Sequence, residues 1–137
     1  MYYGVRTISS IILSEDSGPE DLEPIAFAVH ALTSLPTTIR SQRQKGLRLE
    51  NGVILERGYT GPILEEALKT NRIVRKVPQE GVYKGKPVVV APIRSKDGKV
   101  FAAIGIVDLV TSLDLSDVFR GYPDVIEEVE EAKKRMK

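Results

Sequence analysis

Two runs of apolar residues dominate the second half of the chain and predict its central strands. Pro87–Ser95 and Lys99–Leu109 contain the runs Val88–Ile93 and Val100–Val107, in which apolar and polar positions do not alternate. Such continuous runs are typical of strands that are covered on both faces. The tripeptide Lys96-Asp97-Gly98 suits the turn of a hairpin between them. Because Pro92 has no amide to donate, it indicates an edge, a bulge or a gap in this hairpin.

Shorter alternating runs predict a second hairpin. Asn51-Gly52 separates the two halves of Gly46–Arg57, and both turn positions tolerate a positive φ. A two-residue turn places Leu49 opposite Ile54 on one face. Two further segments are ambiguous: Ile73–Val77, which is a short edge strand or an extended linker, and Thr37–Lys45, which is polar with some β character.

Three segments have the features of helices. The first begins near Asp21, a good N-cap, and ends before Pro36, and its apolar residues predict burial on more than one side. The second covers Pro62–Asn71 and carries an apolar stripe of Ile63, Leu64, Ala67 and Leu68. The third begins near Pro123 or Asp124, with a narrow apolar seam of Val125, Val129, Ala132 and Met136. Residues 5–13 fit either a short strand or an N-terminal helix.

These elements predict one α+β domain over residues 1–137, with N-terminal and C-terminal helices and a single antiparallel sheet of about five strands. If the last strand is central, it pairs with both Gly46–Glu50 and its own hairpin partner. The strand order is then 2-1-5-4-3.

Composition and charge exclude several classes of function. The formal net charge of +1 favours neither nucleic acid nor an anionic membrane surface as a partner. The absence of cysteine excludes disulfides and thiolate metal sites. No window approaches the ~18 apolar residues of a membrane span, so we expect a soluble, cytoplasmic protein. We find no phosphate loop, paired histidines or nucleophile elbow, and therefore expect no enzyme, catalytic residue, metal or cofactor. For the single histidine, His30, we favour a structural role.

The segment from Tyr83 to Asp108 resembles the closing half of Cache-type sensor domains, which belong to the wider PAS/GAF-like group. The shared pattern is an apolar strand ending in Pro-Ile, a turn with Asp-Gly, and a last strand ending in Gly-Ile-Val-Asp. The whole chain is also similar to small uncharacterised archaeal proteins found in methanogens.

The resemblance implies a candidate ligand site. In amino-acid-binding Cache domains the aspartate after the last strand accepts the ammonium group of the ligand, which here implicates Asp108. The alternative for Asp108 is a cap on the amides of Val110 or Thr111. Tyr83 and Arg94 flank the same sheet and would meet an aromatic or carboxylate group of the ligand, or simply face solvent.

The leading functional hypothesis is a cytosolic, sensor-like module that binds a small molecule, an amino acid or carboxylate, and acts through a dimer or a protein partner. It predicts a partly apolar pocket between the sheet and the helix of residues 62–71. The alternative is a non-enzymatic scaffold or assembly subunit with a filled core. In either case a homodimer could form through the C-terminal helix and its seam from Val125 to Met136.

Overall fold

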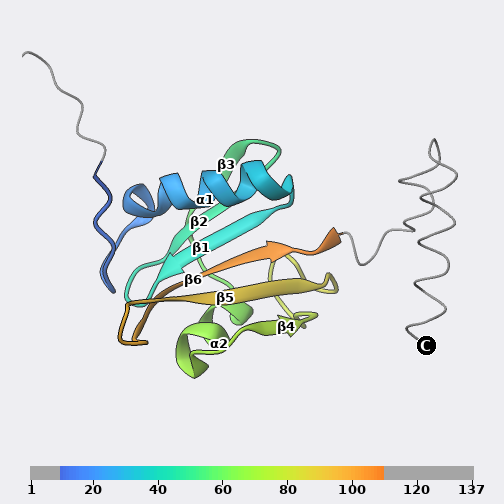
Figure 1. Ribbon diagram of the computed structural model, residues 1–137. Helices are drawn as coiled ribbons and strands as arrows, with labels where there is room; N and C mark the ends of the chain where they lie inside the picture. The colour runs from blue at the N-terminus through green and yellow to red at the C-terminus, as the bar shows by residue number, and fades with distance from the viewer. Residues whose placement is uncertain (1–9, 110–137) are drawn as a thin grey trace, which may run out of the picture.

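The computed structural model of the protein describes residues 10–109 and shows one antiparallel sheet with a helix on each face (Figure 1). The strand order is β3-β2-β1-β6-β5-β4. In chain order the elements are α1 (Pro19–Thr33), β1 (Thr37–Ser41), β2 (Gly46–Glu50), β3 (Val53–Tyr59), α2 (Pro62–Thr70), β4 (Val74–Lys76), β5 (Val88–Arg94) and β6 (Val100–Val107).

The predicted α+β class and antiparallel sheet are confirmed, but the sheet has six strands and not five. The additional strand is β1, which lies between β2 and β6 and pairs with both. The predicted direct pairing of Gly46–Glu50 with the last strand is therefore wrong, although the other five strands keep the predicted order. The sequence of β1, Thr-Thr-Ile-Arg-Ser, conceals its central position because four of its five side chains are polar.

Both predicted hairpins are present. β2 and β3 pair with Leu49 opposite Ile54, and Asn51 and Gly52 adopt the positive φ values of 52° and 79° that their turn requires. β5 and β6 pair along their whole length, with Val90 opposite Gly105. A Cβ atom on Gly105 would lie 2.6 Å from Val90 Cγ2, so this position needs a glycine for the close approach of the two strands.

Successive side chains of each strand point to opposite faces and so create two cores. On one face α1 packs against β1 and β2 through Leu22, Ala26, Ile39, Leu47 and Leu49. On the other face α2 packs against β4, β5 and β6 through Leu64, Ala67, Val74, Val90, Ala103 and Val107.

The first helix differs from its prediction in two ways. It begins at Pro19 with Gly18 as the N-cap, and Asp21 accepts the Gly18 amide from within the first turn at 3.1 Å. Its burial is one-sided: Leu22, Ala26 and His30 are buried, whereas Leu32 is 87% exposed. The expected burial on more than one side is therefore wrong, because β1 and β2 are the only described elements with extensive contacts to α1.

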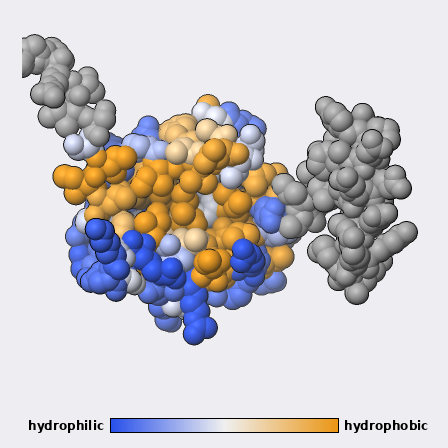
Figure 2. Space-filling model, in the orientation of Figure 1, coloured by the Kyte–Doolittle hydropathy of each residue, from blue (hydrophilic) through white to orange (hydrophobic). Residues whose placement is uncertain are grey.

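One apolar area of the sheet has no helix over it in residues 10–109. Beyond α1, on the same face, β5 and β6 present the partly exposed side chains of Val89, Ala91, Ile93 and Ile104. Figure 2 shows this area as a broad hydrophobic surface beside α1. The predicted C-terminal helix, its seam from Val125 to Met136, and most of residues 5–13 lie outside the described residues.

Candidate functional site

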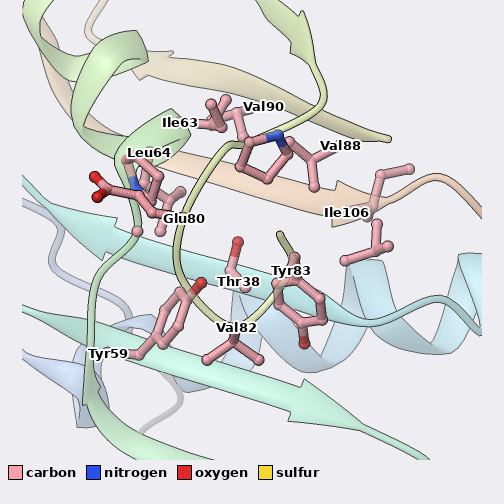
Figure 3. A pocket seen from close by; sticks show the side chains of 14 residues that line it. Thr38, Tyr59, Ile63, Leu64, Glu80, Val82, Tyr83, Val88, Val90 and Ile106 are labelled. Atoms are coloured by element: carbon pink, nitrogen blue, oxygen red, sulfur yellow. The ribbon is translucent and has the colours of Figure 1, made fainter. Parts of the chain in front are cut away.

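The best-formed pocket in the described part of the chain lies between the sheet and the start of α2 (Figure 3). Its walls are the ends of β1 and β3, the first turn of α2, the inward side chains Val88 and Val90 of β5, and the loop of residues 77–87. This is the location that the sequence predicted for a partly apolar pocket. Its internal volume is about 30 Å³, which is room for about two water molecules. We refer to it as the α2 pocket.

Two buried hydroxyl groups in the wall of the α2 pocket have no hydrogen-bond partner among residues 10–109. Thr38 is 7% exposed and Tyr59 is 6% exposed. Buried polar side-chain atoms are paired in most proteins, so two unpaired hydroxyls in one pocket indicate a place for a water molecule or a ligand. Burial also raises the pKa of Tyr59, which keeps its hydroxyl protonated and able to donate.

The first turn of α2 contributes backbone donors to the same pocket. Gly61 is the N-cap and offers no side chain to the helix, and Pro62 occupies the first helical position. The amides of Ile63 and Leu64 have no acceptor in the described structure. A Cβ atom at position 61 would lie 2.8 Å from Tyr59 Oη, so the glycine lets the phenol reach the helix N-terminus.

Tyr83 closes one side of the pocket with its ring, while its hydroxyl faces the opposite way (Figure 3). The hydroxyl donates to Glu50 Oε2 at 2.6 Å, and the Arg48 guanidinium lies 5.9 Å from the ring centroid. Burial, followed by the hydrogen bond to Glu50, raises the pKa of Tyr83 well above its usual range. Tyr83 therefore anchors the loop of residues 77–87 to β2.

The same loop forms the outer wall of the pocket. The Gly85 amide donates to the Pro78 carbonyl at 3.0 Å and brings the two ends of the loop together. Between them Val82 and Glu80 line the pocket although both are exposed. The loop is thus held at its base and at Tyr83, with its tip in solvent.

The structure does not bring the three predicted site residues together. Tyr83 lines the α2 pocket. Asp108 lines a separate surface hollow with Arg75, Lys76 and Pro87, and its amide donates to the Pro87 carbonyl at 2.8 Å. Arg94 lies at the end of β5, where its Nε and Nη2 donate to Oδ1 and the carbonyl of Asn71 at 2.6 and 2.9 Å. Arg94 thus interacts with the C-cap of α2, and the alternative cap of Asp108 on Val110 or Thr111 lies outside the described residues.

The residues that distinguish this pocket were not predicted from the sequence. Thr38 belongs to the strand that was not predicted, and Tyr59 lies between the predicted hairpin Gly46–Arg57 and the predicted helix Pro62–Asn71, in neither element. The available signal was Tyr59-Thr60-Gly61-Pro62, in which an aromatic residue lies two positions before the glycine N-cap of a helix.

No helix among the described residues combines the length and apolar character that crossing a membrane requires. In residues 10–109 no three histidine, aspartate or glutamate side chains come together to hold a metal ion.

Comparisons with known proteins match the chain to a protein family. Residues 29–110 match the family described as "Uncharacterized protein conserved in archaea (DUF2111)". The chain is similar to the uncharacterized protein MJ0405 of Methanocaldococcus jannaschii, with 42% identity over 104 residues that cover 75% of this chain and 79% of that protein. No solved structure matches the chain significantly.

Proposed function

The chain belongs to this family of uncharacterised proteins conserved in archaea, and we propose that it is a cytosolic, sensor-like module that binds a small molecule in the α2 pocket. The similarity to small archaeal proteins, predicted from the sequence, is confirmed. The finer resemblance to Cache, PAS or GAF domains stays a prediction.

One observation carries the proposal: an apolar pocket contains two buried hydroxyls that have no partner among residues 10–109. Small-molecule sites combine apolar walls with a few polar groups that orient the ligand. Here Val88, Val90 and Leu64 supply the apolar wall, and Thr38 and Tyr59 supply the polar groups. Without a ligand or a bound water molecule, both hydroxyls would stay buried and unpaired at a cost of about 1–3 kcal/mol each.

The size of the cavity sets a condition on binding. Drug-sized ligands occupy roughly 300–1,000 Å³, far more than the 30 Å³ open here. The ligand is therefore small, or it displaces the exposed tip of the loop at Val82 while Tyr83 holds the base. Movement of this loop is also the change that a protein partner would sense.

Filling the cavity should abolish binding. Val88→Ile adds one methylene group on the pocket face of β5, and Val89→Ile adds the same group on the opposite face. In a thermal-shift screen of amino acids, carboxylates, purines and methanogen cofactors, we expect a ligand at a hundred times its Kd to stabilise the wild type by about 2.7 kcal/mol. We expect Val89→Ile to retain this shift and Val88→Ile to lose it. Binding that survives Val88→Ile, or a screen without any shift, would contradict the proposal.

The second candidate function is a scaffold or assembly subunit. The observation that favours it is the uncovered apolar area of β5 and β6, since exposed apolar patches of this kind mark interaction sites. A second copy of the chain is the occupant that this candidate requires, because assembly subunits of one kind associate through such faces.

Sedimentation of the full chain distinguishes the two candidates. A scaffold should form a dimer that Val89→Lys dissociates, because a buried lysine without a partner opposes association. The matched control is Val53→Lys on β3, where the valine is 52% exposed outside this area. A wild-type monomer at high concentration would contradict the scaffold role and leave the ligand-binding role intact.

A further inference from the structure

The geometry of the α2 pocket assigns a chemical class to its ligand, and this inference rests on the proposed function. We infer that the ligand presents a carboxylate to the first turn of α2, where it accepts hydrogen bonds from the Ile63 and Leu64 amides and from the hydroxyls of Tyr59 and Thr38. Its remaining part is short and apolar and lies against β5.

The N-terminus of α2 provides the first set of hydrogen-bond donors. The first amides of a helix have no partner within it, and the aligned peptide dipoles give that end a partial positive charge. Within residues 10–109 no side chain accepts from these amides of α2, because the N-cap is a glycine. The glutamate of the first turn, Glu65, is directed elsewhere: its Oε2 accepts from Thr60 at 2.8 Å and lies 3.7 Å from Arg40.

The hydroxyls of Tyr59 and Thr38 provide a second, independent set of donors. Tyr59 Oη lies at the N-cap itself, since only the absence of a Cβ on Gly61 makes room for it. Thr38 Oγ1 faces the same pocket from β1, at 3.2 Å from the position that a Cβ on Gly105 would take. Both side chains are more than nine-tenths buried and unpaired within the described residues. Two hydroxyl donors beside two amide donors match the acceptor-only character of an ionised carboxylate.

The surrounding charges select a carboxylate over a phosphate. The two half-buried guanidinium groups near this region are already paired: Arg48 with Glu50 at 3.0 Å and Glu56 at 3.2 Å, and Arg40 with Glu65 at 3.7 Å. Glu80 at the mouth of the pocket carries a negative charge that would repel a dianion more strongly than a monoanion.

The test uses the full chain and named probes: butyrate and isovalerate, their amides and alcohols, and inorganic phosphate. Amide chemical shifts and Kd values are measured by NMR titration. We expect a carboxylate to bind at least tenfold more tightly than its amide or alcohol, to shift the Ile63 and Leu64 amides, and not to be displaced by phosphate.

Variants that each lack one hydroxyl test which groups donate to the carboxylate. Tyr59→Phe and Thr38→Val each remove one hydroxyl, and each should weaken carboxylate binding about tenfold, the usual effect of losing a hydrogen bond to a charged group. Thr70→Val is the control, because its hydroxyl donates to the Glu66 carbonyl at the far end of α2. Its Kd should equal that of the wild type.

The failures of the two ideas are distinguishable. Equal binding of carboxylate, amide and alcohol, or unchanged Kd values in both hydroxyl variants, would overturn the carboxylate inference and leave small-molecule binding standing. Displacement of the carboxylate by phosphate would assign a general anion site instead. If no carboxylate binds, but the thermal-shift screen finds another ligand whose binding Val88→Ile abolishes, the carboxylate inference fails and the proposed function stands. If neither experiment finds a ligand, both the proposed function and the carboxylate inference fail.

Discussion

Replacing Gly46 with alanine should lower the free energy of unfolding by about 3 kcal/mol or more, because the new methyl group has no space. A Cβ atom at this position would lie 1.8 Å from the Ile39 carbonyl oxygen and 2.8 Å from the Arg40 Cα. These are backbone atoms of β1, so no side-chain rotation relieves the clash. Relief requires β1 and β2 to separate at the centre of the sheet.

Urea denaturation followed by circular dichroism measures this loss. Gly52→Ala is the matched control: its φ of +79° strains an alanine, but nothing lies within 4 Å of the added methyl group. We expect it to cost only about 1–2 kcal/mol. Gly46 itself does not have a positive φ, so a loss in Gly46→Ala no larger than the loss in Gly52→Ala would contradict the clash with β1.

Replacing His30 with alanine should lower the free energy of unfolding by about 2–4 kcal/mol. The buried imidazole hydrogen-bonds two backbone groups outside α1. Nδ1 donates to the Leu35 carbonyl at 2.7 Å, and Nε2 accepts the amide of Gly52, in the turn between β2 and β3, at 2.8 Å. The carbonyl can only accept and the amide can only donate, so the hydrogen bonds themselves define the tautomer. Without the ring, the Gly52 amide loses its partner beside a cavity, and the Leu35 carbonyl keeps only the Thr37 hydroxyl.

Hydrogen exchange provides a readout that a general loss of stability would not reproduce. The Gly52 amide should lose protection in His30→Ala to a greater extent than amides of β5 and β6. The control is Leu32→Ala, two residues further along α1, where the side chain is 87% exposed and the change should cost less than about 0.5 kcal/mol. Unchanged protection of the Gly52 amide would contradict the bridging role of His30.

Local signals in the sequence predicted most of the fold. Asn51-Gly52 and Lys96-Asp97-Gly98 each carry the backbone preferences of their own turn, so both hairpins followed from a few adjacent residues. β1 was missed because Thr37 and Ser41 read as polar. Their hydroxyls are satisfied by nearby backbone groups, since Thr37 donates to the Leu35 carbonyl and Ser41 accepts the Gln44 amide. This local pairing allows polar side chains to be fully buried in a central strand.

The candidate site was less predictable than the fold. The position of the pocket against the helix of residues 62–71 followed from the sequence, and Tyr83 is the one predicted site residue that lines it. The grouping with Asp108 and Arg94 did not appear, because strand register directs Asp108 to another hollow and Arg94 to the C-cap of α2. Thr38 and Tyr59 are 21 positions apart in the numbering, and no local pattern relates them.

The sequence by itself therefore determined the elements that depend on neighbouring residues: the two hairpins, α2 with its Gly61-Pro62 start, and the apolar runs of β5 and β6. Only the tertiary structure decided which strand lies between β2 and β6, and hence which side chains meet. By inserting β1 there, the fold places the Thr38 hydroxyl beneath the first turn of α2 and beside Tyr59. The physical reason is that pairing across a sheet depends on contacts between distant segments, whereas turns and caps depend on the conformational preferences of adjacent residues.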